Sequence, residues 1–346
     1  MIQQRNEITP MTKSIQEMTA IVKTALGPDS ISVISWPRPV PNAGQVIVEV
    51  HGAGVCGTDL HIALDAYPNI PPVVMGHEVA GTVVEIGADV DAKWMGVRVA
   101  CETHHQICKC DFCRVGRRNL CKNKASMGSF VDGGFATYVA VAEELLHPIP
   151  DEVTDHEAAL TEPLACVCHL LLDPPLINVA DTVLVTGPGP MGLLAAQVAR
   201  AAGGIVTISG LEKDRVRLGV AQELGFMITH SPEPESFDIV IECSGNQGGM
   251  NAALNSARRG ARYVAVGIVG HDVTISADVI LYKELLVSSG FGSTPQSWNR
   301  ALKLLENGHV SLAPLISRVE PLKNWPIVYK DLKNAEVLKI VFDPRM

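Results

Sequence analysis

The sequence predicts an α/β fold in which a compact, mostly β domain is joined to a doubly wound parallel sheet. Strand-like segments interrupted by glycine and proline fill the first half of the chain, whereas strands alternate with helices in the second half. That alternation is typical of a doubly wound sheet. A Gly-x-Gly-x-x-Gly loop, Gly187–Gly192, follows one of these strands and opens a helix, which is the context of a dinucleotide site.

Composition limits the class of protein. The 346 residues suit two domains better than one core, and the 47% hydrophobic and 5% aromatic content means that Val, Ile, Leu and Ala build the interior. The net charge of −9 argues against nucleic acid or an anionic membrane surface as partner. No apolar stretch is long enough to span a bilayer. Residues 1–18 are polar and predict an N-terminal extension that is no signal peptide, so we expect a cytoplasmic protein.

The first half contains three predicted strands with no helical pattern between them. They are Gln45–His51, Glu78–Gly87 and Gly134–Val141. We therefore expect a mostly β domain over residues 19–162, to which the C-terminal segment 305–346 returns.

The region 163–304 is expected to form the parallel sheet and its covering helices. A helical pattern over Asp155–Leu172 leads into it. The expected strands are Asp181–Thr186, Ile205–Ser209, Asp238–Glu242, Ala261–Gly267 and Glu284–Ser289, and the expected helices are Leu193–Ala202, Asp214–Leu224, Gly249–Arg258 and Trp298–Glu306.

Each glycine of the loop has a physical role in binding a dinucleotide. Gly187 allows the tight turn, Gly189 lets the backbone approach the pyrophosphate, and Gly192 lets helix and strand pack closely. The pyrophosphate then lies at the positive end of the helix. The residues between the glycines are Pro188, Pro190 and Met191. A glycine-rich turn in an unrelated α/β protein is the alternative interpretation.

The position expected to bind the ribose does not decide between NAD and NADP. An acid that binds the ribose hydroxyls is expected about twenty residues after the loop, but Gly210 stands there. Its lack of charge permits the 2′-phosphate of NADP. Glu212 can still bond the ribose of NAD, and Arg215 is either a phosphate neighbour or a solvated helix residue.

Thiolate, imidazole and carboxylate groups gather in two short motifs and predict a catalytic zinc site. Cys56, His77 and Glu78 offer up to three ligands, and Glu162 offers another. Catalytic zinc keeps one position open for water or substrate and lowers the pKa of a bound alcohol. Taken singly, a lone cysteine or histidine is more often a structural residue. The combination with the dinucleotide loop is what indicates hydride-transfer chemistry.

The segment around Cys56 also offers groups that can move or hold a proton. Thr58 and His61 supply a hydroxyl and an imidazole that can pass a proton to solvent. Asp59 can bind the second nitrogen of His77 and fix its tautomer.

Four of the nine cysteines crowd into fourteen residues. Cys108, Cys110, Cys113 and Cys121 predict a structural zinc site, because such a cluster in an intracellular enzyme is more often a metal site than a disulfide framework. The Cys108-x-Cys110 gap is tighter than the usual two residues. A displaced thiolate that leaves the lobe with weak or no zinc is the alternative.

Together these motifs resemble the medium-chain, zinc-dependent alcohol dehydrogenases, in particular the sorbitol (L-iditol) and threonine dehydrogenase branch. The resemblance covers essentially everything after Met18 and implies a GroES-like catalytic domain, a Rossmann coenzyme domain and a homotetramer or homodimer. The motifs stand in family order: Cys56–His61, Gly76–Glu78, Asn119–Cys121, Asp132–Ala136, Glu162–Leu164 and Gly187–Gly192.

The resemblance also implies roles for individual residues. Zinc is held by Cys56 and His77 with Glu78 as ligand or close neighbour, and Thr58 and His61 fall on the proton-relay positions. The strand end that faces the nicotinamide is expected at Gly267, Ile268 and Val269.

The implied activity is reversible, NAD(P)-dependent oxidation of a small secondary alcohol. Glu162-Pro163 stands where polyol and threonine dehydrogenases carry Glu-Pro or Asp-Pro, which favours a polyol or sugar-like substrate. A threonine-type amino-alcohol dehydrogenase is the second hypothesis, and a non-catalytic dinucleotide-binding protein is the rival of another class. The substrate loops are expected around Tyr67, Phe130 and Phe291.

Overall fold

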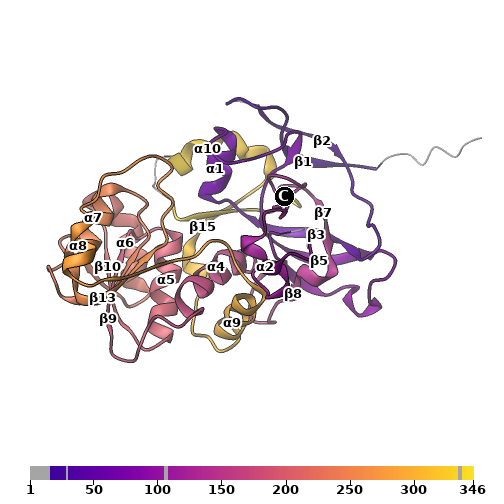
Figure 1. Ribbon diagram of the computed structural model, residues 1–346. Coiled ribbons are helices and arrows are strands. Elements are labelled where there is room, and N and C mark those ends of the chain that lie inside the picture. Colours follow the sequence, from indigo (N-terminus) through magenta and orange to yellow (C-terminus); the bar gives the residue numbers. More distant parts are fainter. Residues whose placement is uncertain (1–15, 29, 105–107, 334–336) are drawn as a thin grey trace, which may run out of the picture.

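The computed structural model describes residues 16–28, 30–104, 108–333 and 337–346. Two halves lie side by side, and helix α4 (Thr161–Leu172) runs where they meet (Figure 1). This helix packs against strands of the first half and against helices of the second. Most of the expected extension, residues 1–15, lies outside the described residues.

The second half is built on a six-stranded sheet in the order β11-β10-β9-β12-β13-β14 with every neighbouring pair parallel. The doubly wound sheet predicted from the sequence is confirmed. Chain order reverses between β9 and β12, and the crevice at such a switch point is where open α/β sheets bind ligands. The strands are β9 (Thr182–Thr186), β10 (Ile205–Ser209), β11 (Met227–Thr229), β12 (Phe237–Glu242), β13 (Ala257–Ala265) and β14 (Leu286–Ser289).

Helices cover this sheet. They are α5 (Pro190–Ala201), α6 (Arg215–Glu223), α7 (Gln247–Ser256), α8 (Asp278–Tyr282) and α9 (Pro295–Glu306). Strand β11 and helix α8 were not expected from the sequence, because both are too short to show a period.

The first half contains a seven-stranded sheet in the order β15-β16-β3-β5-β6-β8, with β7 paired to β3, and a small sheet in the order β2-β1-β4. Strand β16 pairs with β3, so the C-terminal segment completes the sheet of this half. The strands are β1 (Glu17–Lys23), β2 (Ile31–Pro37), β3 (Gln45–Gly54), β4 (Val73–Val74), β5 (Glu78–Ile86), β6 (Arg98–Cys101), β7 (Tyr138–Ala142), β8 (Leu146–Pro148), β15 (Ile316–Glu320) and β16 (Lys339–Phe342).

Three expectations for this half were wrong in detail. Strand β1 already begins at Glu17, so the last two residues of the expected extension belong to a sheet, and Met18 is buried. Strand β7 begins only at Tyr138. The Phe135 backbone instead donates a hydrogen bond to the Met75 carbonyl oxygen and accepts one from the N–H of Ile21 in β1.

The third concerns helices. The expected helix Asp155–Leu172 is two helices, α3 (Asp155–Ala158) and α4. Pro163 has no amide hydrogen and is accommodated in the first turn of α4, where none is needed. Short helices also separate the strands, where none was expected: α1 (Gly57–Ala63) and α2 (Asp111–Arg114), with α10 (Trp325–Lys333) near the C-terminus.

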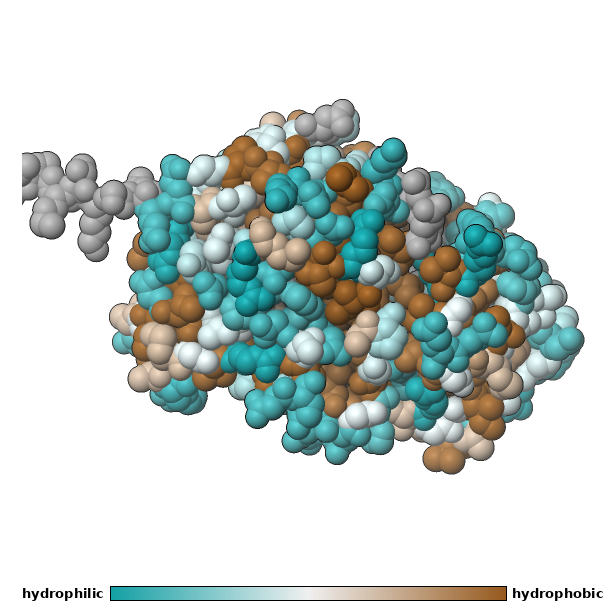
Figure 2. Space-filling model, turned by 180° about the vertical axis from the view of Figure 1, so that it is seen from behind, coloured by the Kyte–Doolittle hydropathy of each residue, from teal (hydrophilic) through white to brown (hydrophobic). Residues whose placement is uncertain are grey.

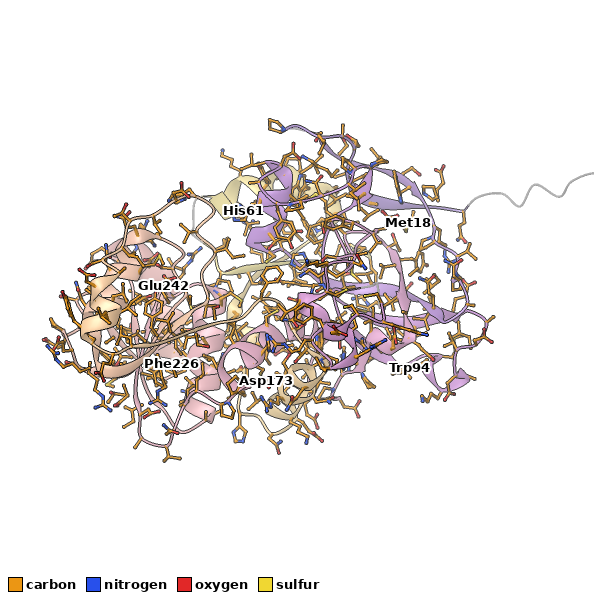
Figure 3. The ribbon with its side chains drawn as sticks, in the orientation of Figure 1. Met18, His61, Trp94, Asp173, Phe226 and Glu242 are labelled. Atoms are coloured by element: carbon orange, nitrogen blue, oxygen red, sulfur yellow. The ribbon has the colours of Figure 1, made fainter. Side chains whose placement is uncertain are left out.

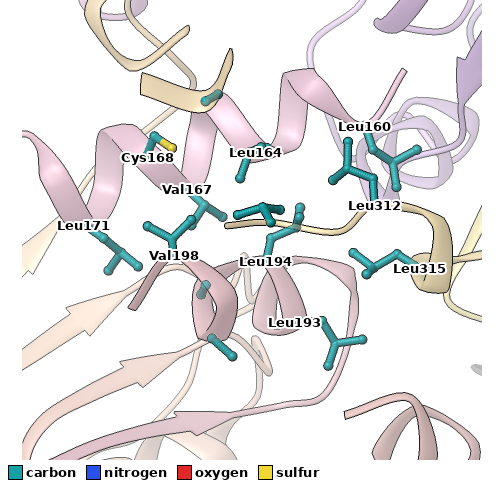
Figure 4. Close-up of a cluster of buried hydrophobic side chains, with 14 of the residues drawn as sticks. Leu160, Leu164, Val167, Cys168, Leu171, Leu193, Leu194, Val198, Leu312 and Leu315 are labelled. Atoms are coloured by element: carbon teal, nitrogen blue, oxygen red, sulfur yellow. The ribbon is translucent and has the colours of Figure 1, made fainter. Parts of the chain in front are cut away.

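Aliphatic side chains join α4 to the second half. Leu164 and Val167 of α4 meet Leu194 and Val198 of α5, with Leu312 packed beside them (Figure 4). All five are almost fully buried, and close-packed interiors of this kind hold their elements in one arrangement. On the rear face, hydrophobic side chains gather near the middle of the molecule (Figure 2). Among the described residues, no helix is long and apolar enough to cross a membrane.

Candidate active site

A cleft of about 420 Å³ lies between the two halves, beside the switch point of the parallel sheet. Its walls come from both halves: His61 lies on α1 (Figure 3), and Cys243 directly follows β12. The lining includes the predicted residues Cys56, Thr58, His61, Tyr67, His77, Glu78, Glu162, Pro190, Met191, Gly267, Ile268 and Phe291. Phe130 and Val269, which we expected there, are not among the lining residues.

The three predicted ligands Cys56, His77 and Glu78 meet on the catalytic half of the cleft. One ligand atom from each lies within 4.8 Å of the others. Cys56 precedes helix α1, and Glu78 begins strand β5 directly after His77. The end of β3 and the start of β5 pair side by side, which is why ligands twenty residues apart come together.

Asp59 links the two motifs. Its Oδ2 accepts a hydrogen bond from the Cys56 backbone N–H at 2.8 Å, and its Oδ1 lies 3.6 Å from Nδ1 of His77. Burial lowers the pKa of the His77 imidazole, but the charges and hydrogen bonds of Asp59 and Cys56 outweigh it, so that pKa is raised well above its usual value. Because Nδ1 faces the Asp59 carboxylate, Nε2 of the neutral ring is left for the ligand side.

Glu78 forms a buried ion pair with Lys339, a residue that the sequence analysis did not predict to lie in the site. Lys339 Nζ, on strand β16, lies 2.6 Å from Glu78 Oε1, and both side chains are almost fully buried. Oε2 of Glu78 has no hydrogen-bond partner among the described residues. Gly54 makes room for it, since a Cβ there would lie 2.1 Å from Oε2.

Glu162 lines the same cleft but stands outside the three-residue cluster. Its Oε1 accepts from the Thr103 hydroxyl at 2.9 Å and from the Cys166 thiol at 3.5 Å. Burial raises the pKa of Glu162, while His77 opposes that rise. The carboxylate is thus close to the cluster, held by a hydroxyl and a thiol.

Thr58 and His61, both on α1, are the two predicted proton-relay residues, and both line the cleft. Thr58 Oγ1 is 3.7 Å from Cys56 Sγ. His61 is partly exposed and reaches the facing half, since a Cβ on Gly270 would lie 3.4 Å from its Cε1.

The glycine loop has the geometry that its sequence suggests. Gly187 has φ +91° and lies against Ser244, and a Cβ on Gly192 would meet the Gly187 carbonyl oxygen at 2.0 Å. Above Gly189 nothing lies within 4 Å of the same position. The loop is therefore tight against the protein at its ends and open in the middle, where the N-terminus of α5 begins.

Glu242 orders the neighbouring strand end. Its Oε1 accepts from the backbone N–H groups of Ser244 and Gly245, at 2.8 and 3.1 Å, and from the Ser244 hydroxyl. A Cβ on Gly267 would lie 2.3 Å from the Gly245 nitrogen. The segments that follow β12 and β13 are thus packed directly against each other.

The three residues expected to distinguish NAD from NADP are not among the residues that line the cleft. Gly210 is buried beneath Pro188, whose Cγ would be 2.9 Å from an added Cβ. Glu212 and Arg215 are exposed, and Glu212 Oε1 lies 3.6 Å from His230 Nε2. The cleft is lined instead by Arg217, two residues further on.

All four cysteines of the predicted lobe come together despite the short first gap. Their sulfur atoms lie within 4.8 Å of one another, and Sγ of Cys108 is 3.2 Å from Sγ of Cys121. The Cys110 backbone N–H and the neighbouring thiols lower the pKa of Cys108 to about 7. This arrangement is a fourfold thiolate donor set, as a closed structural zinc site requires.

Comparison with known proteins agrees with this geometry. Residues 42–151 match the alcohol dehydrogenase GroES-like domain, and residues 190–307 match the zinc-binding dehydrogenases. A sorbitol dehydrogenase of Halalkalibacterium halodurans is 37% identical over 94% of this chain and 99% of its own. The chain belongs to the zinc-binding alcohol dehydrogenase family. The resemblance stated from the motifs is confirmed.

Other members of the family show the range of relatives. An L-threonine 3-dehydrogenase of Saccharopolyspora erythraea is 31% identical over 94% of this chain and 99% of its own. The crystal structure of a zinc-binding dehydrogenase from Sinorhizobium meliloti, bound to NADP, is 32% identical, covers 95% of this chain and 100% of its own, and has a TM-score of 0.87.

The donor set of the cleft fits the metal that names the family. A thiol, an imidazole and a carboxylate are the usual ligands of catalytic zinc, and one Glu78 oxygen is buried without a hydrogen-bond partner among the described residues. Sequence reasoning missed Lys339, Thr103, Arg217 and Glu242. None of these has a motif of its own, although a lysine or glutamate inside a buried strand is a signal that deserved notice.

Proposed function

We propose that this protein is a zinc-dependent dehydrogenase that oxidises a secondary alcohol, a polyol or a sugar-like compound, with NAD(P) as hydride acceptor. The observation that carries the proposal is one cleft lined both by the Cys56–His77–Glu78 cluster and by Pro190 and Met191 of the glycine loop. Metal and nucleotide would then meet over the same substrate.

When bound, zinc would supply Lewis acidity at the alcohol oxygen, and a nicotinamide nucleotide would supply the hydride acceptor. Cys56 and His77 would hold the metal, with Glu78 or Glu162 as the carboxylate. Asp59 fixes the tautomer of His77 through its 3.6 Å contact with Nδ1. Thr58 takes the proton from the alcohol, and the partly exposed His61 releases it to water.

The chemistry of the cleft favours a neutral, polyhydroxylated substrate. The polar residues Thr103, Ser126, Ser129 and Tyr67 line it. Its two described lining cations are already engaged, Lys339 by Glu78 and Arg217 by the Val337 carbonyl oxygen. We infer that sorbitol-like compounds are better substrates than phosphorylated polyols or amino acids.

The test is metal analysis of dialysed protein together with NADH and NADPH formation over sorbitol, xylitol, a sugar phosphate, L-threonine and simple secondary alcohols. Zinc with turnover of a polyol supports the proposal. Turnover of L-threonine alone would establish the amino-alcohol alternative. Nucleotide binding without zinc or turnover would establish the non-catalytic one.

Three further parts of the proposal concern the whole molecule. We propose structural zinc on Cys108, Cys110, Cys113 and Cys121, because their sulfur atoms form the required cluster. We also propose a cytoplasmic location, in which thiolate ligands stay reduced.

A homo-oligomer is the third part. Strand β14 is an edge of the six-stranded sheet, and its Leu286 and Val287 are exposed, as are Leu281 and Tyr282 of the adjacent α8. An exposed apolar edge strand is suited to pairing with the same strand of a second copy, which gives a closed twofold dimer.

A further inference from the structure

The cysteine lobe contacts the loop that forms one side of the cleft. This loop, Gly290–Ser293, connects β14 to α9, and Gly290, Phe291 and Gly292 line the cleft. Asn119, two residues before Cys121, is 1% exposed and donates from Nδ2 to the Phe291 carbonyl oxygen at 2.8 Å. A partly buried hydrogen bond thus joins the lobe to the backbone of the loop.

Lys124 adds a second contact from the same lobe. Its Nζ lies 4.4 Å from the centroid of the Phe291 ring, as in a cation–π pair. The same Nζ donates to the backbone oxygen of Asn119 at 2.7 Å. One cation therefore joins the ring of Phe291 to the residue that holds the Phe291 backbone.

The contacts of Asn119 and Lys124 lie on the cleft side of the loop, where His104 also packs against Gly292. Phe291 lies between two glycines, and Gly292 has φ +66°, a conformation that costs glycine little. Ser293, at the far end, is fixed separately by the indole N–H of Trp298 at 3.0 Å. Asn119 and Lys124 thus hold the part of the loop that Ser293 does not.

We propose that Asn119 and Lys124 are positioning residues that place Phe291 in the cleft. Through them the cysteine lobe takes part in binding the alcohol and the nicotinamide nucleotide, although its four cysteines are not among the described lining residues. The inference rests on the proposed function, since it assigns the loop to that reaction.

The test uses the zinc-loaded, full-length protein with Asn119→Ala and Lys124→Met. Loss of one hydrogen bond or one cation–π pair should raise KM for the alcohol or the nucleotide on the order of five- to tenfold. The value of kcat should stay within about twofold, because a positioning contact of this kind contributes to binding rather than to the chemical step. The NADPH dissociation constant, from nucleotide fluorescence, gives a readout that needs no turnover.

Two control variants separate this role from general stability. Lys124→Arg keeps a cation over the ring and should keep KM within about twofold of wild type. Lys122→Met removes the same charge from an exposed position in the same lobe and should change neither KM nor kcat. Lys124 is only partly buried, so its variants keep the test valid should Asn119→Ala fail to fold.

The outcomes distinguish the inference from the proposed function. If the wild-type protein turns over an alcohol but Lys124→Met keeps wild-type KM and NADPH affinity, the positioning role is refuted and the proposed function stands. An equal shift in Lys122→Met would also refute it. If the wild-type protein has no turnover, the proposed function fails, and unchanged NADPH affinity in the variants would then refute the positioning role as well.

Discussion

Replacing Lys339 by methionine should destabilise the catalytic half and disturb Glu78. Lys339 Nζ and Glu78 Oε1 are 2.6 Å apart, with side chains 5% and 1% exposed. Removing one partner of such a buried pair leaves an unpaired charge and costs about 3–5 kcal/mol of unfolding free energy. The assay is urea unfolding of zinc-depleted Lys339→Met and wild-type protein.

Two further variants show whether the lost stability comes from the unpaired charge. Lys339→Arg keeps the ion pair and should lose less. The double variant Lys339→Met with Glu78→Gln removes both charges and should recover most of the loss. A Lys339→Met protein within about 1 kcal/mol of wild type, or a double variant with no recovery, would refute the reasoning.

The pH dependence of this pair has a definite sign. Burial lowers the pKa of Lys339, but the Glu78 charge outweighs it, so the pKa is raised from 10.5. A raised lysine pKa contributes stability that is fully present below the unfolded value and is lost as pH rises through the folded one. The difference between wild type and Lys339→Arg, whose guanidinium stays charged, should therefore be constant from about pH 6 to 9 and change only above pH 10.5.

Three other predictions follow from the cleft and the sheet edge. Asp59→Asn removes the carboxylate behind His77 and should weaken zinc binding about 10- to 100-fold in a competitive chelator titration. Gly210→Asp should lower kcat/KM for NADP⁺ relative to NAD⁺ about tenfold or more, because a carboxylate near a 2′-phosphate repels it by roughly 1–4 kcal/mol. Leu286→Lys on strand β14 should lower the mass measured by light scattering to that of one chain.

Each has a matched control or a result that would contradict it. Gly210→Asn carries the same crowding against Pro188 without charge, and an equal loss with both nucleotides would contradict the electrostatic argument. Met227→Lys changes the opposite sheet edge, where Met227 is also 58% exposed, and should leave the mass unchanged. Unaltered zinc affinity in Asp59→Asn would show that the 3.6 Å contact does not orient His77.

The sequence determined the fold class and most of the cleft. The glycine loop, its strand and its helix are local in sequence, so their spacing alone predicts their geometry. The cluster residues Cys56 and His77 were predictable for a similar reason, because thiolate and imidazole in short motifs beside a dinucleotide loop indicate one chemistry. The order of the motifs then gave the family.

Only the tertiary structure decided which side chains hold the cluster residues and the cleft loop in place. Lys339 reaches Glu78 from 261 residues away, and Asn119 reaches Phe291 across 172. Neither contact leaves a period or a spacing in the sequence, because each depends on how two distant elements pack. The residue types of the site can thus be predicted from local motifs. The residues that hold those side chains in place depend on the pairing of β16 with β3 and on the contact between the cysteine lobe and the Gly290–Ser293 loop.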